Sequence, residues 1–64
     1  MRYHMPQFLT VEELSDYLHG LPVSTLNYWR AVGKGPRGAR IGRRILYRSQ
    51  DVLQWVDDQY SVQN

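Results

Sequence analysis

Three stretches of the chain repeat apolar residues every three to four positions, the spacing of helices that bury one face. The first stretch, TVEELSDYL, places its acidic residues mostly opposite the apolar ones and predicts an amphipathic helix over about residues 11–18. Thr10 and Glu13 stand three positions apart, as in a capping box, so Thr10 is the expected N-cap. Gly20 is expected at the C′ position, where a left-handed backbone favours glycine.

The second stretch, LPVSTLNYWRAVG, predicts a helix that starts at Pro22 and ends at Gly33. With about 100° of rotation per residue, Val23, Leu26 and Trp29 fall on one side and form the expected buried stripe. The two predicted helices are separated by the short segment HGLP, which is the pattern of a helix-turn-helix. The opposite side is small or polar apart from one tyrosine, and it consists of Ser24, Asn27, Tyr28 and Ala31, with Thr25 at its edge.

A loop rich in glycine, GKGPRG, is followed by strand-forming residues on both sides of a glycine, which predicts a β-hairpin. If residues 42–44 form a three-residue connection, Ile41 lies opposite Ile45 and Ala39 opposite Tyr47, with all four on one face. A two-residue turn would place an arginine opposite Ile41, so the three-residue register is preferred. The hairpin then carries its arginines on the outer face, at Arg40 and Arg48, and at the tip, at Arg43 and Arg44.

The third apolar stretch predicts a last helix over about residues 50–59, with Ser49 as N-cap and the segment from residue 61 onward fraying. The expected fold is therefore mainly α with a small β-hairpin, in the order helix–turn–helix–hairpin–helix. We expect one domain over residues 1–64, with an ordered core of about 8–60. The buried stripe of the last helix is expected to consist of Val52, Trp55, Val56 and Gln59.

The net charge of +2 conceals an uneven distribution. Residues 1–29 and 49–64 are both acidic on balance, whereas residues 30–48 contain seven cations and no acid. Six of these cations are arginine, whose guanidinium suits forked contacts to phosphate, and such a field attracts polyanions. The isoleucines and tyrosine between the arginines favour a structured binding element over a flexible basic loop. For Arg48, contact with the polyanion and pairing with a nearby acid both remain open.

The composition argues against several classes of function. Without cysteine there is no disulfide and no thiolate metal site, which fits a reducing cytoplasm. No apolar run approaches the ~20 residues needed to cross a bilayer, and the N-terminal segment lacks a signal-peptide core. The histidines and carboxylates lack the spacing of a metal or catalytic site, and GKGP is not a phosphate loop. We therefore expect no enzyme activity, no metal, no cofactor and no membrane partner.

The segments LTVEELSDYL, VSTLNYWR, RIGRRILYR and DVLQWV occur in this order and at close spacing. Together they resemble the excisionase-type, MerR-like winged helix-turn-helix DNA-binding proteins, over residues 8–56. The resemblance implies a duplex-DNA partner, with the second helix in the major groove. It also implies that the hairpin, called the wing, grips the neighbouring backbone or minor groove.

Within that scheme each polar side chain has a contact that suits its chemistry. Asn27 suits an adenine edge, and Arg43 at the wing tip suits a narrow minor groove. Ser24 and Thr25 suit a phosphate or a base, while Tyr28 suits a phosphate or a thymine methyl group. The full expected DNA-binding set is Ser24, Thr25, Asn27, Tyr28, Arg30, Ala31, Arg40, Arg43 and Arg44.

Members of this family often carry arginines at the reading positions of the second helix, where this chain has Asn27, Tyr28 and Ala31, so DNA shape is expected to contribute to site choice. The expected role is that of an excisionase, or recombination directionality factor: several copies bind adjacent sites, bend the DNA and assist an integrase. The short tail after the third helix leaves no room for an effector domain, which favours this role. Its expected location is the bacterial cytoplasm, at the nucleoid. A small transcriptional regulator of the same fold is the alternative, and a protein-interaction module without DNA binding is the alternative from another class.

Overall fold

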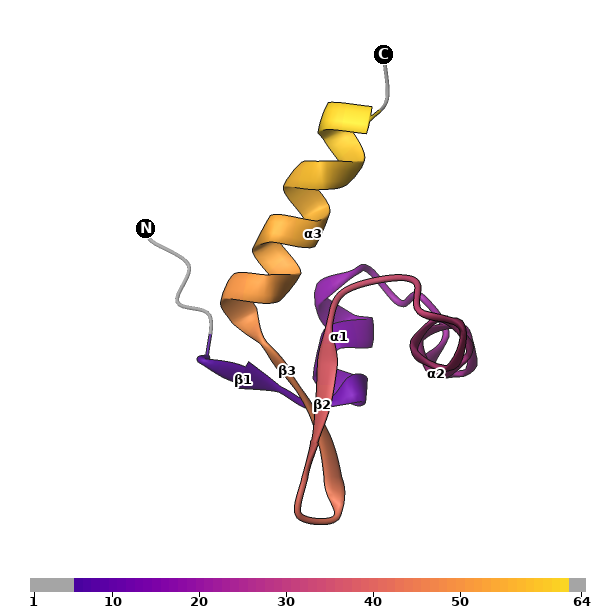
Figure 1. Cartoon of the computed structure of the whole chain (residues 1–64), viewed down its shortest axis with the longest axis vertical. Coiled ribbons are helices and arrows are strands. Elements are labelled where there is room, and N and C mark those ends of the chain that lie inside the picture. Colours follow the sequence, from indigo (N-terminus) through magenta and orange to yellow (C-terminus); the bar gives the residue numbers. More distant parts are fainter. Residues whose placement is uncertain (1–5, 63–64) are drawn as a thin grey trace.

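The structure, a computed structural model, describes residues 6–62, which form three helices and a three-stranded antiparallel sheet (Figure 1). The helix-turn-helix followed by a hairpin and a third helix confirms the expected fold class. The two-residue strand Phe8–Leu9 was not predicted, because a segment this short carries no periodic signal. In chain order the elements are β1 (Phe8–Leu9), α1 (Val11–Tyr17), α2 (Val23–Val32), β2 (Gly38–Ile41), β3 (Arg44–Arg48) and α3 (Ser49–Val62).

Helix α1 begins with the predicted capping box. The backbone N–H of Glu13 donates to the Thr10 hydroxyl at 3.1 Å, and the N–H of Thr10 donates to the Glu13 carboxylate at 2.8 Å. At the other end the C-cap is Leu18, so the C′ residue is His19, with φ 62°, and not Gly20. The N–H groups of His19 and Gly20 donate to carbonyls of the last turn at 3.0 and 2.8 Å, which is a Schellman motif. Gly20 follows with φ 83°, so the left-handed turn spans two residues.

Helix α2 has the predicted boundaries and the predicted faces. Pro22 is its N-cap and Gly33, with φ 80°, is its C-cap. Leu26 is buried, Trp29 packs partly buried against the core, and Val23 is half-buried. The opposite stripe is exposed, apart from the half-buried Thr25 at its edge.

The register of the wing differs from the expected one. Ile41 pairs with Arg44, so the connection is a two-residue turn. Gly42, at φ 64°, supplies the left-handed first residue that such a turn needs. The preference for apolar pairs was misleading here, because this end of the hairpin extends past the core and Ile41 is 51% exposed. One consequence is that Arg40 pairs with Ile45 and shares its face on the helix side of the sheet, instead of facing outward.

Packing against the core explains this register. Gly38 lies opposite Tyr47, and a Cβ atom at Gly38 would lie only 2.8 Å from Cε2 of the Tyr47 ring. The expected register would have placed Ala39 in that position. The strand order β1-β3-β2 puts Tyr47 on the central strand, where it is 1% exposed. The buried core consists of Leu9, Leu14, Leu26, Tyr47 and Val52.

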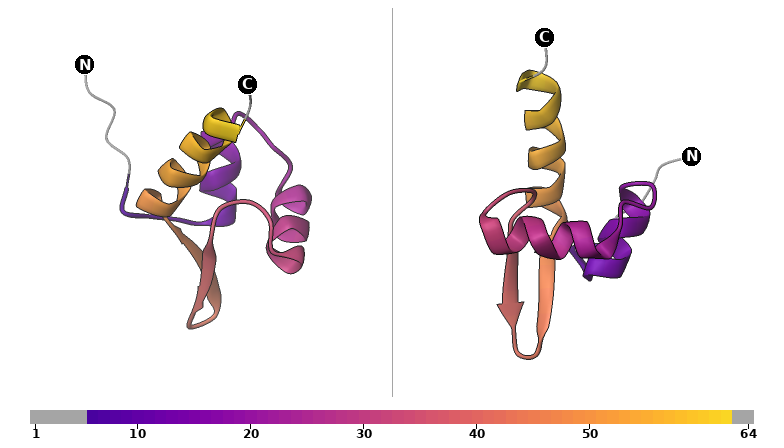
Figure 2. Two further views of the ribbon diagram at one scale, coloured as in Figure 1. Left: turned by 45° about the horizontal axis from the view of Figure 1, so that its top comes forward. Right: turned by 90° about the vertical axis from the view of Figure 1, so that its right-hand side faces the viewer.

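Helix α3 follows β3 directly and is longer than predicted. Ser49, the expected N-cap, is its first residue, and the Ser49 N–H donates to the Gln7 carbonyl at 2.9 Å. The helix continues through Val62 instead of ending near residue 59, while residues 63–64 lie outside the described part. Gln59, expected on the buried stripe, is exposed, because the last turns of α3 extend beyond the body and project away from the wing (Figures 1 and 2).

Candidate nucleic-acid interface

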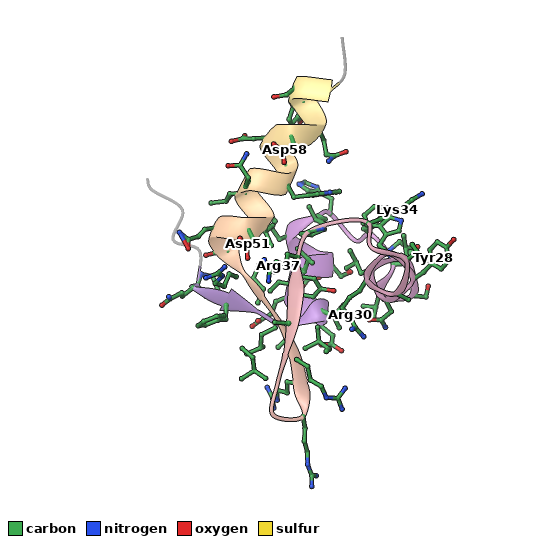
Figure 3. The ribbon with its side chains drawn as sticks, viewed as in Figure 1. Tyr28, Arg30, Lys34, Arg37, Asp51 and Asp58 are labelled. Atoms are coloured by element: carbon green, nitrogen blue, oxygen red, sulfur yellow. The ribbon has the colours of Figure 1, made fainter. Side chains whose placement is uncertain are left out.

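The exposed stripe of α2 is the first component of the candidate interface. Within residues 6–62, the polar side chains of this stripe have no protein hydrogen-bond partner, so they are free to contact another molecule. Tyr28 is 61% exposed and points away from the rest of the molecule (Figure 3). The stripe comprises Ser24, Asn27, Tyr28 and Ala31, with Thr25 beside it.

A shallow hollow connects this stripe with the wing. It is lined by Asn27 of α2 and by Arg44 and Ile45 of β3, so two of the expected DNA-binding residues lie together. The start of α1 forms the remaining wall, and Glu12 is part of it. Its position in the sequence predicts only that Glu12 lies on the solvated face of α1. The tertiary structure adds that Glu12 lines this hollow.

The wing arginines differ in the partners available to them. Arg48 donates to the Asp51 carboxylate at 3.1 Å, so the structure selects the pairing alternative for this residue. Within the described residues, Arg40, Arg43 and Arg44 are exposed and have no carboxylate within 4.0 Å. Arg43 lies in the two-residue turn at the tip. These three guanidinium groups therefore remain available for phosphates.

A second cationic site lies at the C-terminal end of α2. A hollow there is lined by Arg30, Lys34 and Arg37, together with the glycine-rich loop between α2 and β2. Lys34 and Arg37 were absent from the expected set, although both belong to the acid-free segment that marked the wing. In the view of Figure 3, Arg30 lies on the wing side of α2 and Lys34 on the other side. Together with Arg44, these cations border the exposed stripe of α2 on the wing side and at the C-terminal end of the helix.

Arg30 also influences the buried Tyr47. Burial raises the pKa of the Tyr47 hydroxyl above its ordinary value of 10.0, and the positive charge of Arg30 opposes this rise in part. Among the residues that the structure describes, the Tyr47 hydroxyl has no hydrogen-bond partner. The charge of Arg30 therefore acts on the buried Tyr47 hydroxyl, while the Arg30 side chain itself remains exposed at the candidate interface.

This arrangement has the dimensions and the charge of a duplex-DNA interface. The major groove is about 12 Å wide and admits one α-helix, whose diameter with side chains is about 10–12 Å. Cations that border such a helix lie where the phosphate backbones line the groove.

Across residues 6–62, no three side chains of the metal-binding types gather closely enough to hold an ion. Over the same range, no helix has both the length and the apolar character to cross a bilayer.

Comparison with known proteins agrees with this geometry. Residues 8–60 match the helix-turn-helix domain family, so the match covers every helix and strand in the fold except the last two residues of α3. No curated protein and no solved structure matches the chain. The chain belongs to the helix-turn-helix domain family, and DNA is the partner that this membership supports.

Proposed function

We propose that the chain is a DNA-bending recombination directionality factor that binds duplex DNA through α2 and the wing. The observation that carries DNA binding is the exposed polar stripe of α2, bordered on the wing side and at its C-terminal end by cations without carboxylate partners among residues 6–62. The motifs shared with excisionase-type proteins support the narrower role. The proposal places the protein at the nucleoid of a bacterial cytoplasm, next to an integrase, and assigns it no catalytic activity.

In this proposal α2 enters the major groove and the wing contacts the adjacent strand. Asn27 pairs with an adenine edge, while Ser24 and Thr25, in the first turn of α2, bond to a phosphate or a base. Arg43 enters the minor groove or binds its backbone, as its position at the wing tip allows. Arg30, Arg40 and Arg44 bind phosphates, and several copies on adjacent sites bend the DNA together.

The test is selection of bound duplexes from a random-sequence pool at two salt concentrations. We expect enriched direct repeats, and the slope of log affinity against log salt should be about −0.9 per phosphate contacted. Asn27→Ala should blunt the sequence preference by about 1–3 kcal/mol if its contact is bidentate. Arg43→Ala should weaken binding to all sequences and make the slope shallower by about 1.

Arg48→Ala is the matched control for Arg43→Ala, because it removes the same charge from the same hairpin at a residue already paired with Asp51. Equal losses in the two variants would remove the wing tip from the interface. Absence of binding to any duplex would leave the protein-interaction module as the better description.

An excision assay then separates the two DNA-binding roles. Stimulation of integrase-mediated excision by the purified protein supports the directionality factor. A binding site that overlaps a promoter, with effects on transcription and none on excision, would instead establish a small transcriptional regulator of the same fold.

A further inference from the structure

The face of the sheet opposite the helices carries an uncovered apolar patch, which we call the outer sheet face. Phe8, Ala39, Ile41 and Leu46 line a shallow hollow on it, and Phe8 is 41% exposed. Arg37 and Arg48 border the same hollow. Arg48 is paired with Asp51, whereas Arg37 has no carboxylate partner within residues 6–62. The outer sheet face is therefore apolar and cationic.

Helix α3 carries a surface of the opposite charge. Leu53, Asp57 and Tyr60 stand at positions i, i+4 and i+7, so they share one side of the helix, which we call the α3 stripe. All three are exposed, and Tyr60 is 80% exposed. Helix α3 contains three aspartates and no cation. Single exposed apolar residues are common on protein surfaces. Here the apolar residues of the outer sheet face lie next to arginines, and those of the α3 stripe lie next to Asp57.

We propose that the α3 stripe of one copy of this chain binds the outer sheet face of a second copy. Asp57 then lies against the unpaired Arg37, while Leu53 and Tyr60 pack on the apolar patch. Charge complementarity of this kind orients the two partners and disfavours the alternative in which two acidic helices meet. The contact goes beyond DNA binding, because the α3 stripe lies outside the candidate nucleic-acid interface and the outer sheet face shares only Arg37 with the cationic hollow beside α2.

The two surfaces differ from each other, so the contact is head-to-tail. Every open assembly therefore keeps one free α3 stripe at one end and one free outer sheet face at the other. Such a heterologous contact extends into chains unless its rotation closes a ring. Helix α3 projects from the body on the side opposite to the wing tip, which keeps the stripe accessible to another copy (Figure 1). The contact is small, so we expect weak association.

Sedimentation velocity of the full chain without DNA tests this proposal. Between about 10 µM and about 1 mM, we expect the weight-average mass to rise past that of a dimer. Asp57→Arg and Arg37→Glu should each keep the protein monomeric, since both residues are exposed and circular dichroism can confirm that the fold is retained. Asp16→Arg and Lys34→Glu are the matched controls, with the same changes of charge outside the two surfaces, and both should still associate.

Mixing the two interface variants gives the sharpest readout. In the mixture every contact between the two variants joins opposite charges, either the original Asp57 with the original Arg37 or the two substituted residues with each other, so association past a dimer should return. A monomer at every concentration of the unmodified protein would overturn the proposal. Growth that stops at a symmetric dimer, or association that survives either single substitution, would overturn it as well. Because no DNA is present, none of these outcomes depends on the proposed function.

Discussion

Tyr47 shows how one side chain connects the core with the wing. Its ring lies under Gly38 of the neighbouring strand, and its hydroxyl is buried without a partner among the described residues. A buried hydroxyl without a hydrogen bond loses its hydration and gains nothing in return, at a cost of about 1–3 kcal/mol. The buried ring of Tyr47 therefore stabilises the fold by packing, whereas we expect its hydroxyl to lower the free energy of unfolding.

Tyr47→Phe should raise the free energy of unfolding at neutral pH, or leave it unchanged, and should reduce its loss in alkali. The raised pKa means that the folded state holds the Tyr47 proton more tightly than the unfolded state does. Stability is therefore complete below the unfolded pKa of 10.0 and falls as the pH rises from there toward the folded pKa. Urea unfolding from about pH 9 to about pH 11 measures this difference.

Tyr28→Phe is the control for that experiment, because Tyr28 is exposed on α2. We expect this variant to lose stability in alkali as the unmodified protein does. If the Tyr47→Phe variant lost just as much, the buried hydroxyl would not be the group responsible.

Glu12 supplies the second prediction for a single residue. Its carboxylate borders the hollow that Asn27 and Arg44 share, so it repels phosphates that approach there. Glu12→Gln should strengthen duplex-DNA binding by about 0.2–1 kcal/mol, the range of exposed charge pairs. Fluorescence anisotropy at low salt measures the gain, and Asp16→Asn removes the same charge from α1 outside this hollow. A gain of equal size in both variants would indicate a general effect of net charge.

At the scale of the element, the wing depends on one position without a side chain. Gly38→Ala should lower the free energy of unfolding by about 1–3 kcal/mol, the usual cost of overpacking. The added Cβ would meet the Tyr47 ring at 2.8 Å, and that ring is buried among the core residues. The shift of the urea midpoint measures the cost.

Ala39→Val is the control in the same strand, because Ala39 is exposed on the other face. We expect its midpoint to stay near that of the unmodified protein. A Gly38→Ala midpoint equally unchanged would show that the ring can move aside, and the packing explanation of the wing register would then fail.

At the scale of the whole molecule, two tryptophans connect α2 with α3. The rings of Trp29 and Trp55 lie 5.7 Å apart between centroids, at 49° to each other. Trp29 also lies beneath Gly35, where a Cβ would approach its ring to 2.8 Å. The Trp29–Trp55 contact therefore adds to the shared core residues Leu26 and Val52 in fixing the position of α2 relative to α3.

Trp29→Ala should leave a large share of the protein unfolded at room temperature. Truncating a tryptophan that packs against the core costs about 3–5 kcal/mol, and the core of a domain below about 70–80 residues rarely supplies more than about 3–5 kcal/mol. Thermal melting followed by far-ultraviolet circular dichroism, together with Trp55 fluorescence, measures the loss. A cooperative melt close to that of the unmodified protein would show that the sheet and α1 hold the fold without this contact.

The sequence by itself determined the features that depend on neighbouring residues. The capping box at Thr10, the boundaries of α2 and the separation of its two faces followed from propensity and helical spacing, which act within one or two turns. The concentration of arginines in one segment was equally visible, and it identified the wing as the cationic element.

Only the tertiary structure decided what depends on contacts between distant segments. The wing register follows from the space that the Tyr47 ring occupies against Gly38, which no pattern within the hairpin reveals. The same holds for the pairing of β1 with β3 and for the position of Glu12 beside Arg44. In each case the position is set by packing of segments far apart in the chain, whereas periodicity reports only which side of its own element a residue faces.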